Sequence, residues 1–75
     1  MGRMPAVTPR QLIAALKRLG FEVHHVRGSH HYLKHPTDPY VRVTVAFHGK
    51  TLKRGTLRAI LRQANLTVTE LREYL

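Results

Sequence analysis

The spacing of the apolar residues, which changes twice along the chain, constrains the fold more than any other feature. Apolar residues recur at helical spacing in 9–19, alternate with polar residues between 21 and 46, and return to helical spacing after 56. A spacing of three to four residues is the period of a helix, and alternation is the period of a strand. The sequence therefore predicts one α+β domain over residues 1–75, with the order α-β-β-β-α and a short further helix at the end.

The first helix has clear boundaries in the sequence. Thr8 and Gln11 can form a capping box, with Pro9 at a position where no amide is needed. Gly20 is typical of the residue that follows a helix C-terminus. These signals predict a helix from about Pro9 to Leu19.

Two helices are expected in the last third of the chain. Thr56 is the predicted cap of the first of these, which ends near Asn65, and Thr67 with Glu70 can form a second capping box. The expected apolar stripe of the longer helix consists of Leu57, Ile60, Leu61 and Ala64.

The alternating segments 21–27, 30–35 and 40–46 predict a three-stranded antiparallel sheet with the helices on one face. Gly28-Ser29 between the first two suits a type II′ hairpin turn, and the two prolines of 36–39 favour another turn. The inward set is Leu33, Val41, Val43 and Val45. The open face then carries His30, Tyr32, Lys34, Arg42 and Thr44, unless a bulge at Gly28 inverts part of the pattern.

The chain is strongly basic, because it contains 13 Lys and Arg but only 4 acidic residues, which gives a net charge of +9. Such a potential attracts polyanions, either nucleic acid or an acidic protein.

The absence of cysteine excludes disulfides and thiolate zinc sites. No apolar run suits a membrane span or a signal peptide, so we expect a cytoplasmic protein without membrane contact. Residues 1–7 are expected to be flexible.

Histidine occurs six times, and one copy stands out. A metal site is not expected, because the carboxylate or cysteine ligands that usually accompany histidine are missing. Adjacent histidines such as His24 and His25 should also point to opposite faces of the strand. His30 begins the middle strand directly after a glycine turn, where the sheet fixes the ring and a large ligand can reach it. Imidazole can accept the proton of an RNA 2′-hydroxyl, so that this oxygen attacks the adjacent phosphorus without metal or cofactor.

Polar, aromatic and cationic side chains in the predicted fold can hold the phosphate and offset the charge that develops on it. Each of them has the alternative role of an ordinary solvated surface group. The predicted RNA-binding residues are Tyr32, Lys34, Arg42, His48, Lys50, Lys53 and Arg54.

Three motifs together resemble the HicA (YcfA-like) toxins. They are the segment 28–31 (Gly-Ser-His-His), the pair His35-Pro36, and the run 52–64 that contains Gly-Thr-Leu-Arg. The resemblance covers about residues 8–75. It implies a double-stranded-RNA-binding-like fold, mRNA endoribonuclease activity that depends on one histidine, and neutralisation by a HicB-type antitoxin.

Within this resemblance, the position of the motif assigns the catalytic histidine to His30, with Gly28 and Ser29 as the turn that supports it. Some members carry the histidine one place later, so His31 is the second candidate. Ala46 stands where relatives often have proline, which leaves the shape of the following loop open.

Three functions fit the sequence. The first is a toxin of a type II toxin-antitoxin system that cleaves mRNA with His30 and needs neither a metal nor a small-molecule cofactor. The second is a non-catalytic RNA-binding module of the same fold, in which His30 only contacts phosphate. The third is an interaction subunit whose basic face meets an acidic partner.

Overall fold

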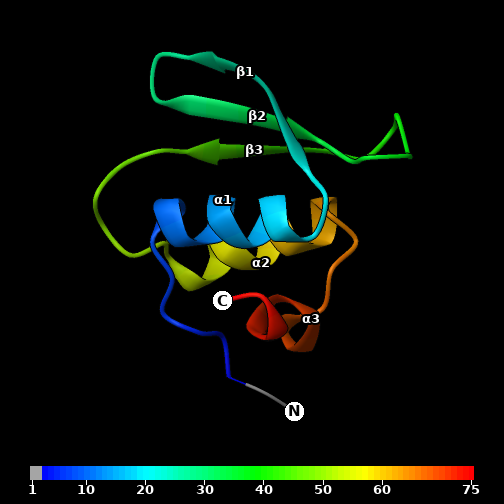
Figure 1. Ribbon diagram of the computed structural model, residues 1–75. Coiled ribbons are helices and arrows are strands. Elements are labelled where there is room, and N and C mark those ends of the chain that lie inside the picture. Colours follow the sequence, from blue (N-terminus) through cyan, green and yellow to red (C-terminus); the bar gives the residue numbers. More distant parts are fainter. Residues whose placement is uncertain (1–2) are drawn as a thin grey trace.

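The computed structural model describes residues 3–75, which form an open sheet with helices on one face (Figure 1). In chain order the elements are α1 (Pro9–Arg18), β1 (Glu22–Arg27), β2 (His30–Lys34), β3 (Arg42–Ala46), α2 (Arg54–Gln63) and α3 (Val68–Glu73). The predicted α+β class, the α-β-β-β-α order and the short last helix are confirmed.

The sheet is an antiparallel meander in which β2 lies between β1 and β3. Arg27 pairs with His30 across the Gly28–Ser29 turn, and the φ of Gly28 is 59°, as the first central position of a type II′ turn requires. On its other side His30 pairs with Ala46. The start of β2 is therefore held between two strands.

A β-bulge in β1 changes how two of the histidines lie. The register shifts between Val23 and His25, so His24 is an extra residue on this strand. The expectation that His24 and His25 point to opposite faces is wrong, because their Nδ1 atoms lie 2.8 Å apart. Since the bulge is here and not at Gly28, the face assignment of β2 and β3 holds.

Helices α1 and α2 cover one face of the sheet, and α3 packs on their far side (Figure 1). The predicted inward face is confirmed, because Leu33, Val43 and Val45 of the strands and Val41 directly before β3 are all buried. The largest fully buried aliphatic side chains include Leu12, Leu16, Leu33, Val43, Val45, Leu57 and Leu71, from all three layers. The opposite face of the sheet stays open to solvent.

Both predicted capping boxes are present, at Thr8 with Gln11 and at Thr67 with Glu70. The predicted cap of α2 at Thr56 is wrong. The first helical bond of α2 joins the Leu57 N–H to the Lys53 carbonyl at 2.9 Å, so Lys53 is the N-cap and has no capping side chain. This N-cap directly follows Leu52, which is buried in the core.

The connection between β2 and β3 is ordered by His35. Its Nδ1 accepts hydrogen bonds from the N–H groups of Thr37 and Asp38, at 3.1 and 3.0 Å, and its ring lies edge-on to Phe21. The carboxylate of Asp38 accepts a bond from the Tyr40 N–H. This turn explains why β3 begins at Arg42, two residues later than the alternation predicts.

The segment before α1 is anchored by backbone contacts. The Leu52 N–H donates to the Val7 carbonyl at 2.8 Å, and Val7 is buried. The predicted flexibility of residues 1–7 stays a prediction, and residues 1–2 lie outside the described part of the chain. Within residues 3–75, every helix is too short or too polar to span a bilayer.

Candidate functional site

Three segments that are distant in sequence meet at one end of the molecule, which we call the turn end. They are residues 7–10 at the start of α1, 27–30 around the β1–β2 turn, and 47–54, which form the loop after β3 and the start of α2 (Figure 1). The Phe47 N–H donates to the Ser29 carbonyl at 2.6 Å. Together with the bond between Leu52 and Val7, this contact fixes the turn and the loop relative to the helices.

His30 lies at the turn end on the open face of the sheet, and its side chain is exposed. The ring centroid lies 6.4 Å from that of Tyr32, and Tyr32 in turn stacks on His25 with centroids 4.4 Å apart and an interplanar angle of 12°. His24 lies edge-on to His25. A row of four rings therefore crosses the open face, and flat rings of this kind are surfaces on which unpaired bases stack.

His31 points the other way, toward the helices, as the alternation predicts. It is half-buried, and its ring centroid lies 4.8 Å from that of Phe47. Its Nδ1 is buried and has no hydrogen-bond partner among the described residues. Arg10 and Lys17 of α1 line the groove that contains this ring.

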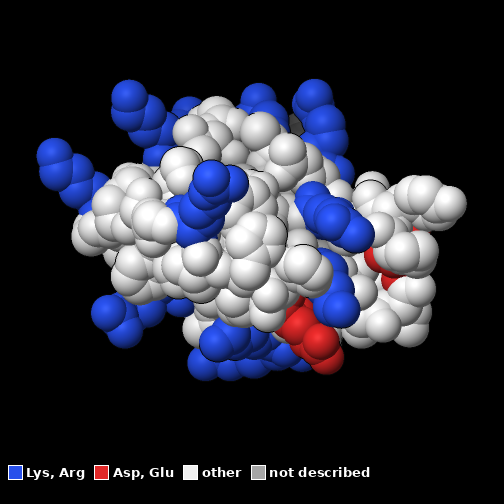
Figure 2. Space-filling model, turned by 90° about the horizontal axis from the view of Figure 1, so that it is seen from above, with Lys and Arg blue, Asp and Glu red and all other residues white. Residues whose placement is uncertain are grey.

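The predicted RNA-binding residues fall into separate groups in the structure. Tyr32, Lys34 and Arg42 share the open face, and Lys34 pairs with Arg42 at the end of the strands that is remote from His30. Figure 2 views this face and shows Lys and Arg side chains across it and around its rim, with carboxylates at one side only. Cations therefore outnumber carboxylates in this view of the molecule.

The remaining predicted residues lie at or near the turn end. His48, Lys50 and Lys53 belong to the loop that follows β3, and all three are exposed. The Lys50 N–H donates to Nδ1 of His48 at 3.3 Å, which orders the tip of the loop. Arg54 differs from them, because its side chain lines a groove on the helix side of the molecule.

Sequence reasoning missed two residues of the turn end, Arg10 and Phe47. The Arg10 guanidinium carbon lies 5.5 Å from the centroid of the Phe47 ring, in cation–π geometry. Arg10 occupies the solvent side of an amphipathic helix, and only its position in the first turn of α1 distinguishes it from other surface arginines. The N-termini of α1 and α2 both lie at this end, where the helix dipoles favour anions.

A comparison with protein families finds a match that covers most of the chain. A family model described as the HicA toxin of bacterial toxin-antitoxin matches residues 9–66, which is more than half of the chain. The chain belongs to the HicA toxin family. No curated protein matches it. The HicA match begins at the first residue of α1 and includes the β1–β2 turn, the loop after β3 and all of α2.

Membership of the HicA family makes this chain a toxin of a bacterial toxin-antitoxin system, which implies an antitoxin partner. The turn end gives such a toxin two exposed histidines, His30 and His48, with the half-buried His31 beside them and a surplus of cations. Among residues 3–75, no three His, Asp or Glu side chains lie close enough together to hold a metal ion. Imidazoles beside cations are groups that can perform acid-base catalysis with electrostatic support.

Proposed function

We propose that this HicA-family toxin is an mRNA endoribonuclease in which His30 is the acid-base catalyst. The observation that carries the proposal is the position of His30, exposed on the open face and paired with both neighbouring strands at the anchored turn. Fixed geometry and access for a large substrate are the two properties that a catalytic imidazole needs.

The proposed reaction requires neither a metal nor a small-molecule cofactor. The His30 imidazole takes the proton of a 2′-hydroxyl, the resulting oxygen attacks the adjacent phosphorus, and the bond to the 5′-oxygen of the next nucleotide breaks. That oxygen leaves with a proton from imidazolium or water, and a cyclic phosphate remains. Lys50, Lys53 and the positive ends of α1 and α2 offset the charge that develops on the phosphate.

The open sheet face is the proposed binding surface for the RNA strand. Tyr32 and the histidine rings beside it offer stacking surfaces, and Lys34 with Arg42 pairs with phosphates farther along the strand. Because the 2′-hydroxyl is itself the nucleophile, the same mechanism restricts cleavage to RNA.

His31 remains the second candidate for the catalyst. Its support is the buried Nδ1, which has no hydrogen-bond partner within residues 3–75 and lies in the groove lined by Arg10 and Lys17. Its half-buried ring leaves less room for substrate than the exposed ring of His30, and for that reason we place the chemistry on His30.

The proposed setting is the bacterial cytoplasm, where mRNA is the substrate and a HicB-type antitoxin neutralises the toxin. The toxin-antitoxin family supports an antitoxin partner for this chain. The net charge of +9 suits a partner with an acidic surface as well as RNA.

The direct test is incubation of a defined single-stranded RNA with the pure protein in the presence of a chelator. The proposal requires cleavage products. Retarded migration without cleavage would instead support a non-catalytic RNA-binding module, and neither effect would support an interaction subunit.

Comparison of His30→Ala with His31→Ala assigns the catalyst. We expect His30→Ala to keep the fold and nearly all RNA affinity but to lower cleavage by about 10² to 10⁴-fold, the usual contribution of a positioned acid-base group. His31→Ala should affect stability more than rate, because its ring packs against Phe47. Single-turnover rates, with folding checked by circular dichroism, separate binding from chemistry.

If only His31→Ala abolishes cleavage, the catalyst is His31, on the side of β2 that faces the helices. If both variants retain the full rate, a mechanism that depends on His30 or on His31 is excluded.

A further inference from the structure

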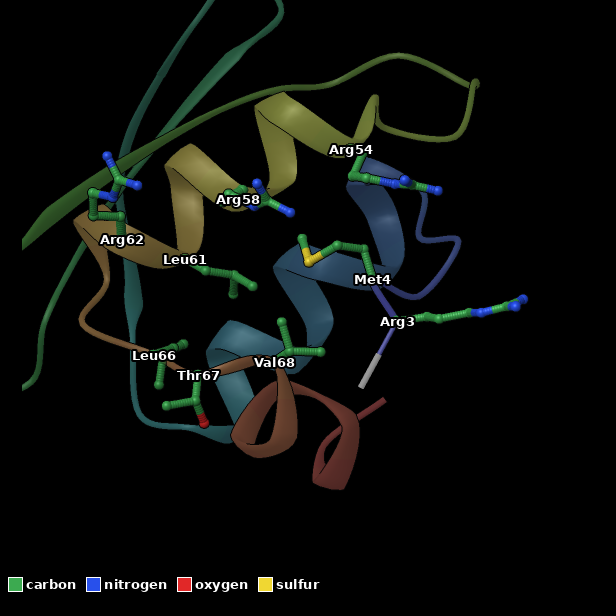
Figure 3. A pocket seen from close by; sticks show the side chains of 9 residues that line it. All are labelled: Arg3, Met4, Arg54, Arg58, Leu61, Arg62, Leu66, Thr67 and Val68. Atoms are coloured by element: carbon green, nitrogen blue, oxygen red, sulfur yellow. The ribbon is translucent and has the colours of Figure 1, made fainter. Parts of the chain in front are cut away.

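A second cationic surface lies away from the open sheet face, in a groove between the N-terminal segment, α2 and α3 (Figure 3). The groove has a volume of about 760 Å³. The Arg72 guanidinium donates a hydrogen bond to the Arg3 carbonyl, which holds the N-terminal segment against α3. The groove is therefore a formed feature of the fold, and the proposed RNA cleavage does not use it.

Four arginines line this groove: Arg3, Arg54, Arg58 and Arg62. The three on α2 are spaced four residues apart and so share one face of the helix. Like charges at this spacing oppose each other and destabilise a helix. None of the described residues that line the groove is acidic, so this repulsion is not relieved among them. An anionic partner in the groove would relieve it.

The floor of the groove is aliphatic. Figure 3 shows Met4, Leu61 and Val68 directed into the space between α2 and α3. Leu61 is buried, and Met4 and Val68 are half-buried. Among the lining residues in 3–75 none is aromatic, whereas the open sheet face carries a row of rings. The groove thus lacks the stacking surfaces that unpaired RNA bases use and instead suits aliphatic side chains.

We propose that this groove docks an acidic, amphipathic helical segment of a partner protein. The aliphatic side chains of such a segment lie on Leu61, Val68 and Met4, and its carboxylates pair with the arginines along α2. Guanidinium groups bind carboxylates in a bidentate manner, which gives the pairing both strength and orientation. The inference rests on the residues of the groove and holds whether or not the protein cleaves RNA.

The test uses a synthetic amphipathic peptide of leucine and glutamate, titrated into the whole protein and followed by methyl NMR. We expect the methyl signals of Leu61 and Val68 to shift. Two matched peptides serve as controls, one with glutamine in place of glutamate and one with serine in place of leucine. Each should bind at least ~10-fold more weakly, because the first lacks the carboxylates and the second lacks the aliphatic side chains. Failure of the first peptide to shift these signals overturns the proposal.

Two charge-reversal variants with equal net charge separate docking from general electrostatic attraction. The groove variant Arg58→Glu with Arg62→Glu should weaken binding of the peptide at least ~10-fold and leave RNA binding and cleavage unchanged. The open-face variant Lys34→Glu with Arg42→Glu should do the opposite. Equal loss of peptide binding in both variants contradicts the proposal.

A single-stranded RNA titration completes the experiment. Shifts of the Leu61 and Val68 methyl signals by RNA, in place of the peptide, would make the groove a nucleic-acid surface and overturn the proposal. Should the groove variant unfold, Arg58→Ala with Arg62→Ala replaces it, with an expected loss of several-fold in peptide affinity only.

Discussion

Gly28 and Gly20 show how single residues shape the connections around the site. Both have positive φ values, 59° and 102°. A Cβ atom at Gly28 would meet nothing within 4 Å, whereas one at Gly20 would lie 3.1 Å from Cγ of Pro36. At Gly28 only the backbone conformation favours glycine. At Gly20 the backbone conformation and the close packing against the β2–β3 connection both favour it.

This difference predicts the effects of two alanine substitutions. Gly28→Ala should lower the free energy of unfolding by roughly 1–2 kcal/mol, the cost of a left-handed conformation for a residue with a Cβ atom. Gly20→Ala should cost more, because Pro36 must also move. Urea denaturation of both variants measures this, and equal losses would contradict it.

The histidines also show which residue-scale predictions depend on regular pairing. The alternation of side chains along a strand correctly predicted that His30 lies on the open face and that His31 points toward the helices, because β2 pairs regularly with β3. The same rule was wrong for His24 and His25, because the bulge in β1 breaks the period there. No residue type in β1 marks a bulge at that position, so the stacked rings beside Tyr32 were not predictable.

At the scale of elements, α2 closes the core against the sheet. Ile60 on this helix is 4% exposed and belongs to the stripe that the spacing predicts. A domain of this size has little stability to lose, since its core is small. The contribution of each buried side chain of α2 is therefore large relative to the total.

Ile60→Ala should lower the free energy of unfolding by about 2–5 kcal/mol, through lost burial and the cavity left behind. Gln63→Ala on the exposed side of the same helix is the matched control, with an expected change within about 0.5 kcal/mol. Thermal denaturation distinguishes the two variants. An unchanged melting temperature for Ile60→Ala would mean that this side chain does not close the core.

At the scale of the whole molecule, the fold divides the positive charge between two surfaces. The open face and the turn end combine cations with rings, and the groove beside α2 combines cations with aliphatic side chains. This division suggests separate sites for RNA and for a protein partner, although the net charge alone does not distinguish between them.

The salt dependence of RNA binding tests the contribution of the turn end. The affinity should fall steeply as salt rises, because each phosphate contact releases counterions. Lys53→Ala should flatten the logarithmic slope by about 0.7, the value for one contact with a single strand. Arg54→Ala should leave the slope unchanged, because the Arg54 side chain lines the groove beside α2. A slope near zero in the unchanged protein would contradict the electrostatic model. An equal change of slope in both variants would mean that the groove also contacts RNA.

The sequence by itself determined the order of the elements, both capping boxes, the hairpin turn and the faces of β2 and β3. These features depend on interactions between near neighbours in the chain, which leave a regular period or a local motif in the residues. The tertiary structure alone decided the start of α2, the bulge in β1, the contact of Arg10 with Phe47 and the groove beside α2. Each of these results from packing between segments that are distant in sequence, and such packing leaves no local pattern by which to predict it.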